Sequence, residues 1–227
     1  MKKLLYIVLL AYFVFLTSNL DAQDSRRFHF GPKIGLSVTD IRYKEFYESY
    51  YQFAGGYISY TNMKLNFSAG LIIEYDLIPT EKYGLSIDIV PQYVKKGCWY
   101  LSDGLSGNIY MHYMDIPVEL HGKLRISKSK YMVLGLGPTF NIGIIQVNKS
   151  QEPVGNDIKH YKSILQFDEN GNGLHRLDIG SNATIGIESI RGFRFDLSYY
   201  FPLRNLSIDK SKSVKHFSVA ASIGYMF

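Results

Sequence analysis

The sequence predicts an all-β fold, an eight-stranded antiparallel up-and-down transmembrane β-barrel with long outer loops and short periplasmic turns. Eight segments of the 227-residue chain alternate apolar and polar residues, which is the pattern of strands with one apolar face. The connections between these segments are alternately long and short, as in outer-membrane barrels. Aromatic residues gather at both ends of the apolar faces, where they would meet the two membrane interfaces.

Residues 1–22 are predicted to be a signal peptide, which leaves residues 23–227 as the barrel domain. Lys2 and Lys3 precede an apolar run over residues 4–16, and Ala22 is the expected cleavage position. The run is too short to span a bilayer. An uncleaved membrane anchor is the alternative.

The last predicted strand, residues 215–227, shows the alternation most clearly. Its odd-numbered residues from Phe217 onward are apolar, and its even-numbered residues are mostly small or polar. It ends on Tyr225 and Phe227, which we expect to lie at the lipid interface and to be recognised by the barrel-assembly machinery.

The other strands follow the same pattern and are expected over residues 28–38, 67–75, 83–93, 110–123, 132–142, 176–188 and 193–201. Four prolines fall inside these segments: Pro32, Pro91, Pro117 and Pro138. Because proline has no N–H to donate to a neighbouring strand, we expect bulges or strand ends at these positions.

Three predicted connections are short, at residues 78–82, 125–130 and 189–192, and four are long, at residues 39–66, 96–108, 145–173 and 202–214. Short turns are assigned to the periplasmic end and long loops to the outer end. The aromatic residues expected at the periplasmic rim are Phe28, Tyr75, Tyr83, Phe193 and Phe227. Those expected at the outer rim are Phe67, Tyr93, Tyr110, Phe201 and Phe217.

The polar faces of the strands carry glycine, serine and charges of both signs, which suits a crowded lumen better than a wet exterior. A soluble lipocalin-like barrel, with the apolar face inside, is the alternative. Buried charges must pair, so we predict a lumenal charge network. Its expected members are Lys33, Glu74, Asp88, Asp115, Glu119, Lys123, Arg176, Asp178, Glu188, Arg194 and Asp196. An eight-stranded barrel has room for little beyond its own side chains, so a narrow pore is a secondary hypothesis.

No catalytic, metal-binding or cofactor-binding residues are predicted. Residues 168–173 open like a calcium loop, but the twelfth position is Ile179 rather than glutamate. Four histidines are expected near the outer end together with Asp157 and Asp168: His112, His160, His175 and His216. Their spacing singles out no nucleophile, so an outer-rim hydrolase or acyltransferase is kept only as an alternative function. The formal charge of +5 is scattered along the chain, so no nucleic-acid partner is expected.

The first long loop is a candidate recognition surface, because tyrosines offer rigid contact area with a polar tip. Its aromatic residues are Tyr43, Phe46, Tyr47, Tyr50, Tyr51, Phe53, Tyr57 and Tyr60. These rings could instead cap the barrel mouth or touch lipopolysaccharide. Cys98 is the one cysteine of the chain, so no internal disulfide can form. We expect it to be an inert interface residue beside Trp99.

Several segments, in this order and spacing, resemble the PorT-type outer-membrane β-barrel domain. They are residues 86–97, 112–120, 135–138, 177–180 and 224–227. The resemblance spans most of the mature chain and implies a barrel of the Gram-negative outer membrane. It supplies no catalytic residues. The expected function is a structural or interaction protein that presents loops at the cell surface or docks an envelope complex of the secretion type, with lipid and an envelope protein as partners.

Overall fold

The computed structural model describes residues 27–44, 60–78, 82–102, 105–154, 157–165, 167, 174–208 and 213–227. The strands are β1 (Phe28–Lys44), β2 (Tyr60–Ile78), β3 (Tyr83–Ile89), β4 (Gln92–Ser102), β5 (Leu105–Ser127), β6 (Lys130–Val154), β7 (Asp157–Leu165), β8 (Leu177–Ser189), β9 (Phe193–Pro202) and β10 (Ser213–Tyr225). None of the described residues forms a helix long and apolar enough to cross a membrane.

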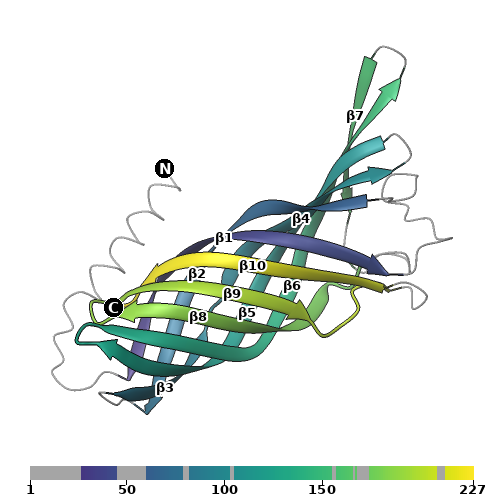
Figure 1. The fold of residues 1–227 in the computed structure, drawn as a ribbon. Coiled ribbons are helices and arrows are strands. Elements are labelled where there is room, and N and C mark those ends of the chain that lie inside the picture. The colour runs from purple at the N-terminus through teal and green to yellow at the C-terminus, as the bar shows by residue number, and fades with distance from the viewer. Residues whose placement is uncertain are drawn as a thin grey trace, which may run out of the picture.

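The strands close into a ring of eight positions, which confirms the predicted fold class (Figure 1). β3 and β4 follow one another in a single position between β2 and β5. β7 extends the row of β8 along β6. The ring closes where β1 pairs with β10, from Lys33 opposite Gly224 to Lys44 opposite Ser213. All pairings are antiparallel, and within the described residues every strand except β7 pairs with a neighbour on both sides.

The predicted turns are confirmed, but the predicted long loops are too long. β2 to β3, β5 to β6 and β8 to β9 are joined by brief links, and Gly192 takes a positive φ of 87° in the last of them. At the other end the strands continue well into the predicted loops, and β7 lies wholly inside one of them. Apolar alternation marks only the lipid-facing part of a strand, so the projecting parts escaped it. Figure 1 shows the β4–β5 and β6–β7 hairpins extending beyond the barrel at this end.

The expectation of bulges or strand ends at four prolines holds for one of them. Pro91 lies in the break between β3 and β4, and its carbonyl oxygen accepts a bond from Leu71 N. Pro32, Pro117 and Pro138 lie inside β1, β5 and β6, where the register continues without a shift. In the β5–β6 ladder the two pairs that would include Pro138 and Gly137 are missing, but the register is the same on both sides of this gap.

The apolar faces of the strands point outward. Large apolar side chains all around the ring are exposed, among them Ile34 at 61%, Leu136 at 59% and Ile185 at 51%. The charged side chains Glu74, Asp88 and Arg194 are at most 2% exposed. A soluble barrel has the reverse arrangement, whereas a lipid-facing exterior requires this one.

An apolar cluster fills the lumen toward the outer end. It consists of Ile41, Cys98, Ile109, Met111, Tyr113, Phe167, Leu174, Leu206 and Val214. The strand residues among them occupy inward positions where the sequence analysis expected loops or polar groups. Phe167, Leu174 and Leu206 lie in the described parts of the connections, and their side chains are buried in this cluster. The cluster therefore fills the outer part of the lumen with apolar side chains.

Candidate functional site in the lumen

Arg194 on β9 is the centre of the lumenal charge cluster nearer the short turns. Its Nε donates to Asp196 Oδ1 at 2.8 Å, and its Nη1 donates to Asp88 Oδ2 at 2.6 Å. Nη1 also lies 3.3 Å from Glu74 Oε2. Since these residues come from β2, β3 and β9, the guanidinium ties together strands on opposite sides of the ring. A planar group with five donors is suited to bridging several carboxylates.

His121 extends this cluster toward β8. Its Nε2 lies 2.9 Å from Glu119 Oε2, and its Nδ1 lies 3.0 Å from Asp88 Oδ2. Asn182 donates to the other oxygen of Glu119 at 2.7 Å. Lys33 donates to Asp196 Oδ2 at 2.9 Å. Buried carboxylates on four strands thus each meet at least one donor, as charges out of water must.

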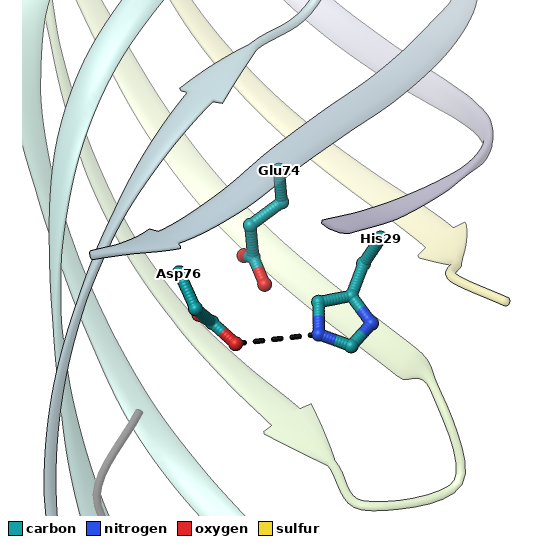
Figure 2. Close-up of side chains that lie close together, drawn as sticks. All are labelled: His29, Glu74 and Asp76. Atoms are coloured by element: carbon teal, nitrogen blue, oxygen red, sulfur yellow. Dashed lines mark hydrogen bonds and ion pairs between the residues drawn. The ribbon is translucent and has the colours of Figure 1, made fainter. Parts of the chain in front are cut away.

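The same cluster opens toward the periplasmic mouth, where Figure 2 shows His29, Glu74 and Asp76 side by side. His29 lies opposite Glu74 in the β1–β2 register, and its Nε2 is 3.3 Å from Asp76 Oδ2. Ligand atoms of the three residues lie within 4.8 Å of one another. Lys123 Nζ, however, is 2.5 Å from Glu74 Oε1 and 3.8 Å from Asp76 Oδ1. An ammonium group therefore already supplies the positive charge that a metal ion would bring, and an ion-pair network is the better description.

A second polar cluster lies in the lumen between the cluster around Arg194 and the apolar cluster at the outer end. Lys96 on β4 lies 2.8 Å from Asp115 Oδ2 and donates to Asn141 Oδ1 at 3.1 Å. Tyr200 donates to Asp178 Oδ2 at 2.6 Å. The ring of His216 stacks on Tyr200 at a centroid distance of 4.7 Å. Between the two clusters lies a cavity of about 50 Å³ whose walls combine apolar surface with polar side chains, including Ser37, Ser68, Thr139 and Ser222, and which is suited to a few water molecules.

Glycines on the lumenal face make room for the large side chains of these clusters. A Cβ at Gly143 would meet the ring of Phe167, and one at Gly180 would meet the ring of Tyr200. Gly135 and Gly186 lie in the same way against His121 and Asp196. The glycine content of the polar face therefore reflects the filling of a narrow lumen.

The structure places ten of the eleven residues expected in the lumenal network inside the barrel, and it corrects the eleventh. Arg176 is exposed. It precedes the first residue of β8, Leu177, so the alternation of that strand does not extend to it. Glu188 Oε2 lies 3.0 Å from Lys123 Nζ near the short-turn end of the barrel. Asp115 and Asp178 belong to the second polar cluster, which contains Lys96, rather than to the cluster around Arg194.

The expected outer-rim histidines do not form one group. His216 lies opposite Ile41 near the outer end, as expected, but it is fully buried in the lumen, 3.0 Å from Lys96 Nζ, rather than exposed at the rim. His112 lies on the outward face and bonds to the hydroxyl of Tyr93. His160 is exposed on β7, and His175 precedes β8. The side chain of Asp157 and residues 168–173, which include the suggested calcium loop, lie outside the described residues.

Most of the candidate recognition loop also lies outside the described residues. This applies to Phe46, Tyr47, Tyr50, Tyr51, Phe53 and Tyr57. Tyr43 and Tyr60 belong to the ends of β1 and β2, and only their backbones are described. At the opposite end of the barrel, Phe227 N donates to Phe30 O at 2.9 Å. The ring of Tyr225 packs edge-on against Phe193 and Phe227.

The sequence analysis missed Lys96, His121 and Tyr200 as lumenal residues. Lys96 was placed in a loop, although it continues the even-numbered inward positions of β4. His121 was on the predicted polar face but was not counted as a charged partner. The signal that could have found all three is parity: each lies an even number of residues from a predicted lumenal position on its own strand.

The chain is similar to one family model and to several solved structures. The family model described as the outer membrane protein β-barrel domain matches residues 21–207. No curated protein matches the chain. Among solved structures, the attachment invasion locus protein Ail of Yersinia pestis is 13% identical, with 89% of this chain and 100% of that chain covered and a TM-score of 0.38. Neisserial surface protein A is 12% identical, with 90% and 100% covered and a TM-score of 0.43. The N-terminal barrel domain of Pseudomonas aeruginosa OprF is 12% identical, with 86% and 97% covered and a TM-score of 0.27.

Proposed function

Because the chain belongs to the family of outer membrane protein β-barrel domains and lies in the outer membrane, we propose that it is a non-catalytic surface-interaction protein. Its projecting β6–β7 hairpin would bind a partner protein. The partner contributes an extended, acidic segment that adds as a further strand to the free edge of β7. We also propose the PorT-type branch of the family, cleavage of residues 1–22 as a signal peptide, and assembly through Tyr225 and Phe227 by the barrel-assembly machinery.

The exposure of β7 carries the proposal. In the described part of the chain β7 pairs with β6 alone, and its residues are exposed on both faces, with Ile158 at 62%, Tyr161 at 48% and Ile164 at 59%. A strand with one unpaired edge and apolar side chains on both faces is a template for strand addition. An outer-membrane protein has no need of such a strand to span the bilayer.

The charge of β7 indicates the kind of segment that would pair with it. The described basic side chains of the strand are Lys159, His160 and Lys162, and no carboxylate is among the described side chains of β7. Lys162 also lies directly opposite Lys149 of β6, and like charges in that position destabilise a strand pair. An acidic partner strand would relieve this repulsion. The tyrosine-rich connection between β1 and β2 emerges at the same end and would be a second contact surface.

The packing of the lumen argues against a narrow pore, and the positions of the histidines argue against an outer-rim enzyme. The apolar cluster around Tyr113 and Phe167 lies across the outer end of the lumen, and two ion-pair clusters lie below it, which disfavours a pore. The histidines suggested for an outer-rim enzyme are divided between the lumen, the outward face and β7.

A photo-crosslinking experiment in intact cells tests the proposal. A photoreactive phenylalanine analogue is placed at Tyr161, with Ile144 on the lipid-facing side of β6 as the matched control. We expect a protein crosslink from Tyr161 alone, mapped to an acidic extended segment of the partner. The double substitution Lys159→Glu and His160→Glu is expected to reduce this crosslink at least fivefold. A crosslink that ignores the charge reversal, that maps to a second copy of this chain, or that forms with lipid alone contradicts the proposal.

A further inference from the structure

Three lysine side chains surround one tyrosine ring on the outward face of the sheet. The Nζ atoms of Lys64, Lys95 and Lys149 lie 4.0, 4.2 and 5.7 Å from the centroid of the Tyr110 ring. The lysines belong to β2, β4 and β6, and Tyr110 belongs to β5 between the last two. The strand register thus gathers three positive charges from residues far apart in the sequence. We call these four residues the lysine–tyrosine cluster.

The lysine–tyrosine cluster lies where the lipid-facing band ends toward the outer end of the barrel. Tyr110 and His112 continue the outward positions of Met114, which is 38% exposed and belongs to the apolar exterior. Just below, the ring of Tyr93 lies 5.8 Å from Phe67 and 5.9 Å from His112. Aromatic rings of this kind mark the lipid interface. The three ammonium groups are therefore at the height of the lipid headgroups in the outer leaflet.

The described part of the chain offers these ammonium groups no carboxylate. Lys64 Nζ donates to Tyr110 Oη at 2.7 Å and to Asn108 Oδ1 at 2.5 Å, both neutral acceptors. Lys95 and Lys149 face the same ring. Lys162 adds a fourth positive charge opposite Lys149. This contrasts with the lumen, where every described lysine meets an acidic partner, so the charge of the cluster is available to an external anion.

We propose that the lysine–tyrosine cluster binds a phosphate group of the outer-leaflet glycolipid. Lysine binds phosphate as a point charge with several free donors, and three such groups around one ring more than balance the charge of about −2 on a phosphate monoester. The apolar band directly below offers Phe67 and Tyr93 to the acyl chains of the same molecule. The ligand is therefore a lipid whose phosphate and chains are contacted together. This inference shares Lys149 and Lys162 with the partner proposed for β7, but it does not require that partner.

Lipid titration of the full-length, detergent-solubilised protein tests the inference. Native mass spectrometry would measure binding of bisphosphorylated lipid A, dephosphorylated lipid A, phosphatidylglycerol and inorganic phosphate. We expect bisphosphorylated lipid A to bind at least tenfold more tightly than each of the other three. Equal binding of dephosphorylated lipid A, or equally tight binding of inorganic phosphate, overturns the assignment to a glycolipid phosphate.

The variant that tests the cluster is Lys64→Gln, Lys95→Gln and Lys149→Gln combined. Lysines near a charged lipid surface each contribute several-fold to affinity, so we expect at least tenfold weaker binding of lipid A. Lys82→Gln is the matched control, because Lys82 Nζ lies 5.3 Å from the Tyr83 ring at the periplasmic end, and it should leave binding unchanged. Should the triple variant fail to fold, Lys149→Gln and Lys149→Arg are compared: only the first should weaken binding. Unchanged binding of lipid A by the triple variant, or an equal loss of binding in Lys149→Gln and Lys149→Arg, refutes the proposal.

Discussion

Replacement of Arg194 by methionine is expected to lower the free energy of unfolding by about 3–5 kcal/mol, the usual cost of removing one partner from a buried ion pair. The guanidinium is 2% exposed and contacts Asp196, Asp88 and Glu74. Methionine fills a similar volume but leaves three buried carboxylates facing one another. Urea unfolding in lipid vesicles, followed by the fluorescence of the single tryptophan, Trp99, measures the change.

Two further variants separate the lost charge from general disruption. Arg191→Met alters an exposed arginine in the neighbouring turn and should change stability by less than about 0.5 kcal/mol. Adding Asp88→Asn to Arg194→Met should recover part of the loss, since it removes one of the uncompensated charges. Equal stability of Arg194→Met and the unaltered protein would show that the lumenal network is not needed to hold the barrel together.

A charged side chain on the outward, lipid-facing surface should lower the free energy of unfolding almost as much as the replacement of Arg194. Ile34 lies near the middle of the lipid-facing part of β1, is 61% exposed and sits between Ala69 and Ile223 of the neighbouring strands. Ile34→Arg is expected to cost about 2–4 kcal/mol, as for arginine near the bilayer midplane. The same unfolding measurement in vesicles gives the value. In a water-exposed position the substitution would be nearly neutral.

Leu203 provides the matched control for Ile34. It is 62% exposed but follows the end of β9 in the outer connection, beyond the apolar band. Leu203→Arg should therefore cost no more than about 1 kcal/mol, because the cost of a charge falls toward the interface. Equal effects of the two substitutions would mean that depth in a bilayer does not set the penalty.

The sequence was sufficient for the ring of strands because its information there is local and periodic. The alternation of β8 and β10 follows from facing lipid on one side and a packed lumen on the other. The short turns were located to within a few residues for the same reason, since they interrupt the alternation. Lumenal positions such as Glu74, Asp88 and Arg194 followed from parity alone.

The outer end of the barrel could not be predicted in the same way. β4, β5 and β6 continue beyond the lipid band, where neither face must be apolar, so the pattern fades although the strands do not end. The inward turn of Phe167, Leu174 and Leu206 depends on tertiary packing against Ile109 and Met111. His216 shows the same limit, because its burial results from stacking on Tyr200 and Tyr113 of other strands.

Spin labels along β8 test most directly whether the apolar faces lie in lipid. In a Cys98→Ala background, single cysteines at Asn182, Ala183, Thr184, Ile185 and Ile187 are labelled in protein reconstituted into vesicles. Labels at Ala183, Ile185 and Ile187 should collide freely with dissolved oxygen and hardly with a water-soluble nickel complex, and labels at Asn182 and Thr184 should be shielded from both. Strong nickel collisions at Ala183, Ile185 and Ile187 would contradict the lipid-facing exterior and with it the fold assignment in the membrane.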